Sequence, residues 1–91
     1  MPVTVRVPTP LRKLTGDEEV VLVQVGTIAT AIAELERRYP GMAERLVDDK
    51  GEVRRFVNVY VNEEDIRFRD NSNTPIQDGD EVSIIPAIAG G

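Results

Sequence analysis

The chain has 91 residues, and its 11 Lys or Arg against 16 Asp or Glu give a formal net charge of −5. This length allows one domain with a single core. With no cysteine and no histidine, the chain lacks thiolate chemistry, disulfides, and the commonest general base and metal ligand. The negative charge disfavours a nucleic-acid partner. We therefore expect a substrate or partner of other proteins rather than an enzyme, with no metal site and no bound cofactor.

The N-terminal residues alternate between apolar and polar, and they do not form a basic stretch followed by an apolar run. This pattern does not match a secretory signal. No apolar segment approaches the length that a membrane span requires. We therefore expect a cytoplasmic protein without a membrane partner.

The first 25 residues predict two strands. Residues 3–7 alternate valine with polar residues, which is the period-two pattern of a strand with one buried face, and Pro8 ends it. A second strand is predicted over 19–25. We expect Val21 and Val23 to face the core, although their neighbours in this nearly continuous apolar run compete for that face.

One long amphipathic helix follows, over residues 28–39. Thr27 is placed to cap it, because a threonine hydroxyl can accept from an unpaired amide of the first turn. The helix is expected to end before Pro40, and a short helical turn is expected over 42–47. The residues predicted to face water on the long helix are Glu34, Glu36, Arg37 and Arg38.

The second half of the chain predicts three more strands. The clearest, over 55–62, alternates valine with polar or aromatic residues. A short edge strand is expected around 66–68, and a final strand is expected over 81–85, ended by Pro86. The residues expected to face the core are Val57, Val59, Val61, Val82 and Ile84.

This order of elements predicts the fold class. One long helix can cover only one face of such a sheet, so the fold is α+β, with one main helix on a mixed sheet of four to five strands. That is the ubiquitin-like β-grasp layout, in which the first and last strands lie side by side in parallel. We expect the β-grasp domain to span residues 1–85 and an extended tail to span 86–91.

The last six residues are small or apolar and finish on Gly90 and Gly91. Extended, they reach about 20 Å, which is far enough to enter the active site of another protein. Glycines pass slots that are too narrow for other residues. We expect the chemistry to take place at the C-terminal carboxylate of Gly91, with Gly90, Ala89 and Ile88 threading into a partner.

A partner-binding patch is expected beside this tail. Phe56 and Tyr60 lie on the strand face away from the core, and Ile85, together with Ile88 of the tail, extends their apolar area. Exposed aromatic area tends to mark an interface. The alternative is that Phe56 and Tyr60 are ordinary, partly buried sheet residues.

Four stretches of the chain resemble one family. They are VTVRVPTPLRKLTG, TAIAELERRYPGMAERL, RFVNVYVNEEDIRF and DGDEVSIIPAIAGG. Together they resemble the ThiS/MoaD family of ubiquitin-like sulfur carriers over essentially the whole chain, and they are most similar to the CysO-type carriers of cysteine biosynthesis. Small subunits of molybdopterin synthase tend to carry a different, proline-rich sequence before their glycines, where this chain has residues 86–89.

The resemblance implies a reaction sequence. A ubiquitin-activating-like enzyme uses ATP to adenylate the carboxylate of Gly91, which is then converted to a thiocarboxylate. Activation is needed because an ionised carboxylate is a poor electrophile. The resemblance further implies sulfur transfer to a cysteine synthase that carries pyridoxal phosphate, followed by release of cysteine by a metalloprotease.

Other functions stay open from sequence alone. Within the family, the chain could be a molybdopterin-synthase small subunit or a thiamine sulfur carrier. A ubiquitin-like protein modifier would use the same adenylation and differ only in the nucleophile, a lysine of another protein. A β-grasp module that binds partners without covalent chemistry would not need Gly91 at all.

Overall fold

The computed structural model describes residues 2–86. Five of its strands form one mixed sheet, in the order β2-β1-β7-β4-β5. These strands are β1 (Val3–Arg6), β2 (Val20–Val23), β4 (Val57–Val61), β5 (Glu64–Asp65) and β7 (Glu81–Pro86). A separate pair joins β3 (Gly26–Thr27) to β6 (Pro75–Ile76). The helices are α1 (Ile28–Arg38), α2 (Met42–Leu46) and the 3₁₀ helices η1 (Thr9–Thr15), η2 (Ile66–Phe68) and η3 (Asn71–Asn73).

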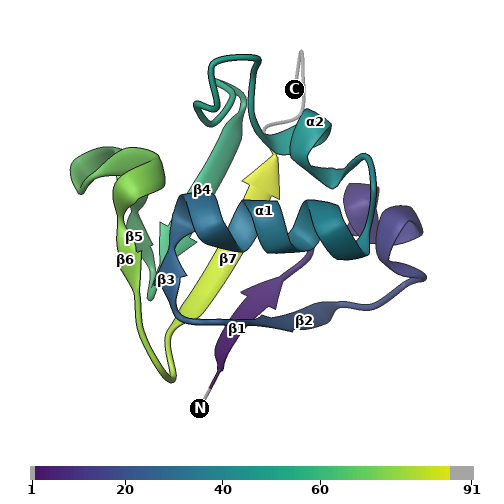
Figure 1. The fold of residues 1–91 in the computed structure, drawn as a ribbon, viewed down its shortest axis with the longest axis horizontal. Helices are drawn as coiled ribbons and strands as arrows, with labels where there is room; N and C mark the ends of the chain where they lie inside the picture. The colour runs from purple at the N-terminus through teal and green to yellow at the C-terminus, as the bar shows by residue number, and fades with distance from the viewer. Residues whose placement is uncertain (1, 87–91) are drawn as a thin grey trace.

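The first and last strands lie side by side at the centre of the sheet. β1 and β7 pair in parallel, with Val5 opposite Val82, and β4 pairs with the other side of β7 in antiparallel. Helix α1 crosses one face of this sheet (Figure 1). The predicted β-grasp layout is therefore confirmed, and β7 ends in the middle of the sheet. No helix within residues 2–86 is long and apolar enough to span a bilayer.

The core lies between α1 and the sheet. Val21 and Val23 are buried and Val20 and Leu22 are exposed, which confirms the predicted face of β2. The apolar face of α1 packs on these strands through Ile28, Ala31, Ile32 and Leu35, all of them buried. The other residues predicted to face the core are buried as well: Val57, Val59, Val61, Val82 and Ile84.

Thr27 caps α1, as predicted. Its hydroxyl accepts from the backbone N–H of Thr30 at 3.3 Å, and the Thr30 hydroxyl accepts from the N–H of Thr27 at 2.9 Å. Two donors that the first turn leaves without helical partners are satisfied by this exchange. At the other end, Tyr39 closes the helix before Pro40, also as predicted.

The prediction for Glu34 is wrong, because this residue is only 7% exposed. Its carboxylate accepts from the backbone N–H of Gln24 at 3.0 Å and pairs with the guanidinium of Arg38, one turn along α1. Gln24 follows the last residue of β2, where the sheet offers its N–H no partner. The flank of α1 lies over this point, so Glu34 joins the helix to the end of the strand.

The edge strand predicted around Ile66–Phe68 is also wrong. The strand there is the two-residue β5, reached through a tight turn at Asn62 and Glu63, whose φ angles are 50° and 72°. Pairing stops at Asp65 because its carboxylate accepts from the N–H of Arg67 at 2.8 Å and starts η2 instead. A local side-chain acceptor of this kind competes with a sheet ladder.

Pro86 is the last residue of β7, one residue beyond the predicted end of that strand. Asn62 donates to the carbonyl of Glu81, so the odd-numbered residues of β7 point their backbone groups toward β4. Pro86 stands opposite Val57 at a position whose N–H would point away from β4. Its missing donor therefore costs no bond to β4.

Asp48 closes the turn between α2 and β4. Its carboxylate accepts from the backbone N–H groups of Lys50 at 2.9 Å and Glu52 at 3.0 Å. The bond from Glu52 is the main reason why the pKa of Asp48 lies below its ordinary value. The ionised carboxylate of Asp48 therefore stabilises the fold. This stabilisation is fully present above the ordinary pKa of an aspartate and is lost as the pH falls through the lower pKa of Asp48 in the folded protein.

The Glu34 contact can be tested by substitution. Glu34→Ala is expected to lower the free energy of unfolding by about 1 to 2 kcal/mol, because it leaves the Gln24 N–H and Arg38 without a charged acceptor. The matched control is Arg37→Ala on the exposed side of α1, which is expected to change stability by less than about 0.5 kcal/mol. Urea unfolding measures both, and equal effects would contradict the role given to Glu34.

Candidate functional site

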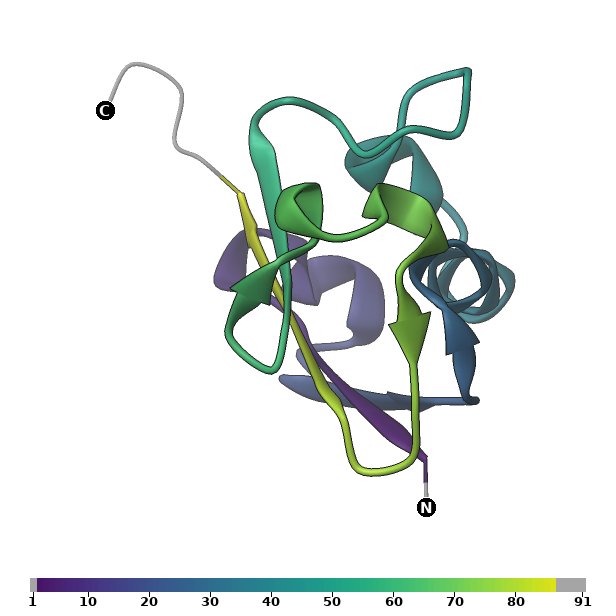
Figure 2. The same cartoon turned by 90° about the vertical axis from the view of Figure 1, so that its left-hand side faces the viewer.

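The residues predicted to hold the chemistry, Gly91, Gly90, Ala89 and Ile88, lie outside the described residues. The structure describes the point from which they continue, which is the end of β7. Figure 2 shows this end of β7 running beside the start of β4. Ile85 lies opposite Asn58 and Pro86 opposite Val57, whereas pairing with β1 stops at Ser83.

The three predicted partner-binding residues share one region of the sheet. The valines of β4 point toward α1, so Asn58 and Tyr60 point to the opposite, open face. Ile85 lies directly across from Asn58 on that face and is 51% exposed, and Phe56, one residue before β4, is 56% exposed. Tyr60 is half-buried. We call Phe56, Asn58, Tyr60 and Ile85 the tail-root patch.

Arg67 borders this patch, and the sequence analysis missed it. Its guanidinium donates to the side-chain oxygen of Asn58 at 2.7 Å, to the carbonyl of Arg55 at 2.8 Å and to that of Val57 at 3.1 Å. The two carbonyls flank Phe56. Arg67 therefore fixes the backbone on both sides of the most exposed side chain of the patch.

An arginine is needed here because β5 is short. β5 pairs only with Tyr60 and Val61, so the outer edge of β4 before these residues has no neighbouring strand. The forked guanidinium of Arg67 supplies donors to that edge in place of a strand. Nothing in the sequence around Arg67 signals this role, because its acceptors lie 9 to 12 residues away.

The centre of the open face is polar. Arg6 of β1 and Glu81 of β7 form an ion pair there, with Nε and Oε2 2.8 Å apart. Val20 and Leu22 of β2 add exposed apolar area to the β2 side of this face. Within residues 2–86, no group of three or more His, Cys, Asp or Glu is placed to hold a metal ion.

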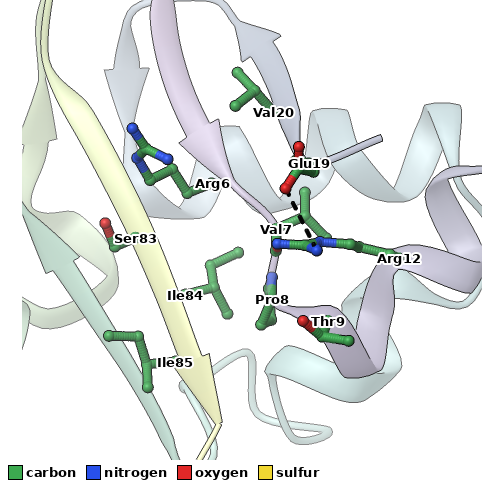
Figure 3. Close-up of a pocket in the computed structure, with 10 residues that line it drawn as sticks. All are labelled: Arg6, Val7, Pro8, Thr9, Arg12, Glu19, Val20, Ser83, Ile84 and Ile85. Carbon is green, nitrogen blue, oxygen red and sulfur yellow. Dashed lines mark hydrogen bonds and ion pairs between the residues drawn. The ribbon is translucent and has the colours of Figure 1, made fainter. Parts of the chain in front are cut away.

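A groove lies on the other side of the end of β7. It has a volume of about 440 Å³ and runs between β7 and the first turn of η1. Figure 3 shows Ile84 and Ile85 on one wall and Pro8, Arg12 and Val20 on the other. The end of β7 is therefore flanked by β4 on one side and by this groove on the other, and Ile85 belongs both to the tail-root patch and to the groove.

Comparisons with known proteins agree with this architecture. The ThiS family model matches residues 5–91. The sulfur carrier protein CysO of Mycobacterium tuberculosis is 48% identical over 93 residues, covering 100% of both chains. Its crystal structure has a TM-score of 0.89 to this chain at 46% identity, covering 94% of this chain and 99% of CysO.

Two further relatives bear on function. A chain in the crystal structure of the BexX/CysO complex of Amycolatopsis orientalis has a TM-score of 0.92 at 44% identity, covering 98% of this chain and 99% of its own length. Small archaeal modifier protein 3 of Haloferax volcanii is 42% identical over 65 residues, covering 71% of this chain and 70% of its own length.

The chain belongs to the ThiS family. Its whole-length similarity to CysO confirms the predicted class, a ubiquitin-like sulfur carrier of the CysO type that is not itself an enzyme. The roles of Gly91, of the tail residues and of Phe56, Tyr60 and Ile85 remain predictions.

Arg67 gives the site a test in the free protein. Arg67→Ala is expected to lower the free energy of unfolding by about 1 to 2 kcal/mol and to speed amide exchange around Phe56, because three acceptors lose a charged donor. Arg67→Lys should restore only part of the loss, since an ammonium lacks the fork.

The matched control is Arg69→Ala. The guanidinium of Arg69 lies 3.5 Å from the carboxylate of Glu64 at the surface, a pair expected to contribute at most about 0.5 kcal/mol. If Arg67→Ala left exchange around Phe56 unchanged, the positioning role of Arg67 would be wrong.

Proposed function

We propose that this chain carries sulfur as a thiocarboxylate at Gly91 and delivers it to cysteine biosynthesis in the cytoplasm. The proposal rests on the similarity to CysO sulfur carriers over the full length of both chains. The geometry supports it, because β7 ends in the middle of the sheet, beside the tail-root patch and the groove.

The chemistry begins with a carboxylate that is ionised at neutral pH and has no leaving group. In the proposed first step, a carboxylate oxygen of Gly91 attacks the α-phosphate of ATP in an activating enzyme, and pyrophosphate leaves. A sulfur nucleophile then attacks the carbonyl carbon and AMP leaves. The chain has no cysteine, so the activated terminus meets no thiol of its own.

The proposed acceptor of the sulfur is a cysteine synthase that carries pyridoxal phosphate. In this scheme the sulfur becomes that of a cysteine joined to Gly91, and a metalloprotease then hydrolyses the bond to release the amino acid. Both ATP and pyridoxal phosphate belong to partner enzymes. The carrier itself contributes its terminus and the surfaces that present it.

Intact-protein mass spectrometry tests the proposal. Protein with an unmodified C-terminus, purified from its native cells, is expected to show a gain of about 16 Da, because one sulfur replaces one oxygen. A second species heavier by one cysteine residue would place the carrier in cysteine synthesis. The control is a variant with one alanine added after Gly91, which is expected to show neither gain.

One result would overturn the proposal. If wild-type protein kept the plain carboxylate mass after incubation with ATP, a sulfur source and extract of its native cells, Gly91 would not be the sulfur-carrying group.

We also propose that the tail-root patch binds the activating enzyme. Phe56→Ala and Ile85→Ala are each expected to raise KM for adenylation by roughly five- to tenfold, as loss of a buried interface side chain does. The control is Phe68→Ala. Phe68 is 83% exposed but lies on η2, off the sheet face, and its loss is expected to leave KM within about twofold. Equal KM values for all three variants would refute the patch.

A second function has one observation in its favour, the similarity to small archaeal modifier protein 3. A modifier would transfer the activated Gly91 to lysines of other proteins. Extract incubated with ATP and labelled carrier would then contain a ladder of conjugates that resist thiol reagents. A carrier restricted to sulfur transfer is expected to give a thiocarboxylate and no ladder.

A further inference from the structure

Strand β2 forms one edge of the five-stranded sheet, because it pairs with β1 and, within residues 2–86, with no other strand. Figure 1 shows β2 at the margin of the sheet, on the side of β1 away from β7. The N–H of Val7 donates to the carbonyl of Glu19 at 2.8 Å, so the odd-numbered residues of β2 point their backbone groups toward β1. The backbone groups of Val20 and Leu22 therefore point outward.

The residue that follows β2 shows the same alternation. The N–H of Gln24 donates at 3.0 Å to the carboxylate of Glu34 on α1, rather than to β1. Glu34 therefore occupies one end of the outer edge. In the described part of the chain, no hydrogen bond joins the outward N–H or carbonyl of Val20 or Leu22 to another residue. The middle of this edge keeps free donors and free acceptors.

The opposite edge of the sheet is protected. β5 has only two residues, both acidic, and Arg67 donates to the carbonyls at the start of β4. Short strands and charged side chains are common means by which proteins keep a sheet edge from pairing. β2 instead has four consecutive apolar residues, and Val20 and Leu22 are 41% and 50% exposed. The β2 edge is therefore open to an added strand.

We propose that the outer edge of β2 binds an extended segment of a partner protein as an added strand. The backbone of the segment exchanges hydrogen bonds with Val20 and Leu22, and its apolar side chains lie beside theirs on the open face of the sheet. Strand addition to a sheet edge is a general mode of peptide recognition. Because β1 lies between β2 and β7, this partner leaves the tail-root patch accessible to an enzyme that acts on Gly91.

The charge beside this edge specifies the chemistry of the segment. Asp17, Glu18 and Glu19 precede β2, and all three are exposed. Glu19 lies 3.5 Å from the guanidinium of Arg12, whereas the carboxylates of Asp17 and Glu18 have no partner among the described residues. Lysine or arginine next to the apolar residues of the segment complements this acidic end. The segment is therefore basic at the end that lies beside Glu18.

A second copy of the chain fits this edge less well than a basic partner segment. Each copy carries a net charge of −5, which opposes self-association. β2 has only four residues, and pairing two such strands buries far less than the roughly 1,200 Å² of a stable interface between two proteins. A short segment of a partner needs no such area for a transient contact.

Hydrogen exchange with a model peptide tests the added strand. The probe is a short synthetic peptide of alternating valine and threonine with lysines at both ends, added to the isotope-labelled full chain. The amides of Val20 and Leu22 are expected to exchange at least fivefold more slowly with the peptide, because they gain acceptors. Those of Val21 and Val23, which face β1, are expected to change less than twofold. Equal protection of all four amides, or none at millimolar peptide, would overturn the proposal.

Substitution of Leu22 tests the backbone bonds themselves. Leu22→Pro removes one outward donor and no bond to β1, so it is expected to raise the Kd of the peptide at least fivefold. The control, Leu22→Val, keeps the N–H and an apolar side chain and should leave Kd within twofold. Circular dichroism and urea unfolding verify that both variants fold. Unchanged binding by folded Leu22→Pro would show that the edge does not pair with the peptide.

Charge reversal tests the chemistry of the segment without altering the backbone. Glu18→Lys is expected to raise the Kd of the lysine-flanked peptide at least threefold at low salt, and less at high salt. The control is Asp49→Lys in the turn between α2 and β4, which changes the net charge equally and should leave Kd within twofold. Equal effects of the two variants would contradict a basic end beside Glu18.

Two other results would also contradict the proposed contact. If the free wild-type chain formed a dimer that Leu22→Pro abolished, the edge would bind a second copy. If the peptide slowed exchange around Phe56 rather than at Val20 and Leu22, it would bind the tail-root patch. None of these measurements depends on chemistry at Gly91, so the added strand and the proposed sulfur transfer can fail separately.

Discussion

The parallel pairing of β1 with β7 is the contact on which the rest of the structure depends. It joins Val5 near the start of the chain to Val82 near its end. In the five-stranded sheet, β2 lies on the β1 side of this pair, and β4 and β5 lie on the β7 side. A parallel contact between such distant residues forms only after a long loop closes. Its stability must therefore come from α1, which buries the valines of both strands against its apolar face.

Two prolines then set how far the central strand is supported. The pairing of β7 with β1 stops at Ser83, because Pro8 follows in the chain of β1. The pairing of β7 with β4 continues as far as Pro86. The last three residues of β7 therefore have a neighbouring strand on one side and a groove on the other. The position of Pro8 creates this asymmetry, because a residue with an N–H there could have continued the ladder.

The sequence predicted the parts of the fold that repeat with a fixed period. Valine or isoleucine at every second position identified β1, β4 and β7, and Thr27 identified the start of α1. The edge strand expected at 66–68 is absent because of a local bond, from the N–H of Arg67 to Asp65, whereas the error at Glu34 and the missed role of Arg67 concern backbone that is distant in sequence. Glu34 reaches Gln24 and Arg67 reaches Arg55, and neither contact has a pattern in the sequence that could reveal it.

The same distinction applies to the site. Tyr60 and Ile85 were brought to one face by strand alternation, which is a local property, whereas Phe56 lies in the turn just before β4. The groove depends on where β1 stops relative to β7. The carbonyls on the outer edge of β4 depend on Arg67 for their donors. Both are set by register between segments far apart in the chain. Residues that position a site through such contacts are found only once the strands are placed.

A carrier of this kind must separate recognition from reactivity. With no cysteine or histidine, the body offers few groups that could react with an activated terminus, so its contribution to the chemistry is to be recognised. Surfaces at the root of the terminal segment are suited to that task. Once a partner holds the body there, entry of Gly91 into its active site becomes an intramolecular step, at an effective concentration set by a short connection of a few residues. If the partner bound a surface farther from the end of β7, a longer distance would separate that surface from Gly91, and the effective concentration of Gly91 at the active site would be lower. The proposed docking surface should therefore lie at the end of β7, where the tail-root patch is found.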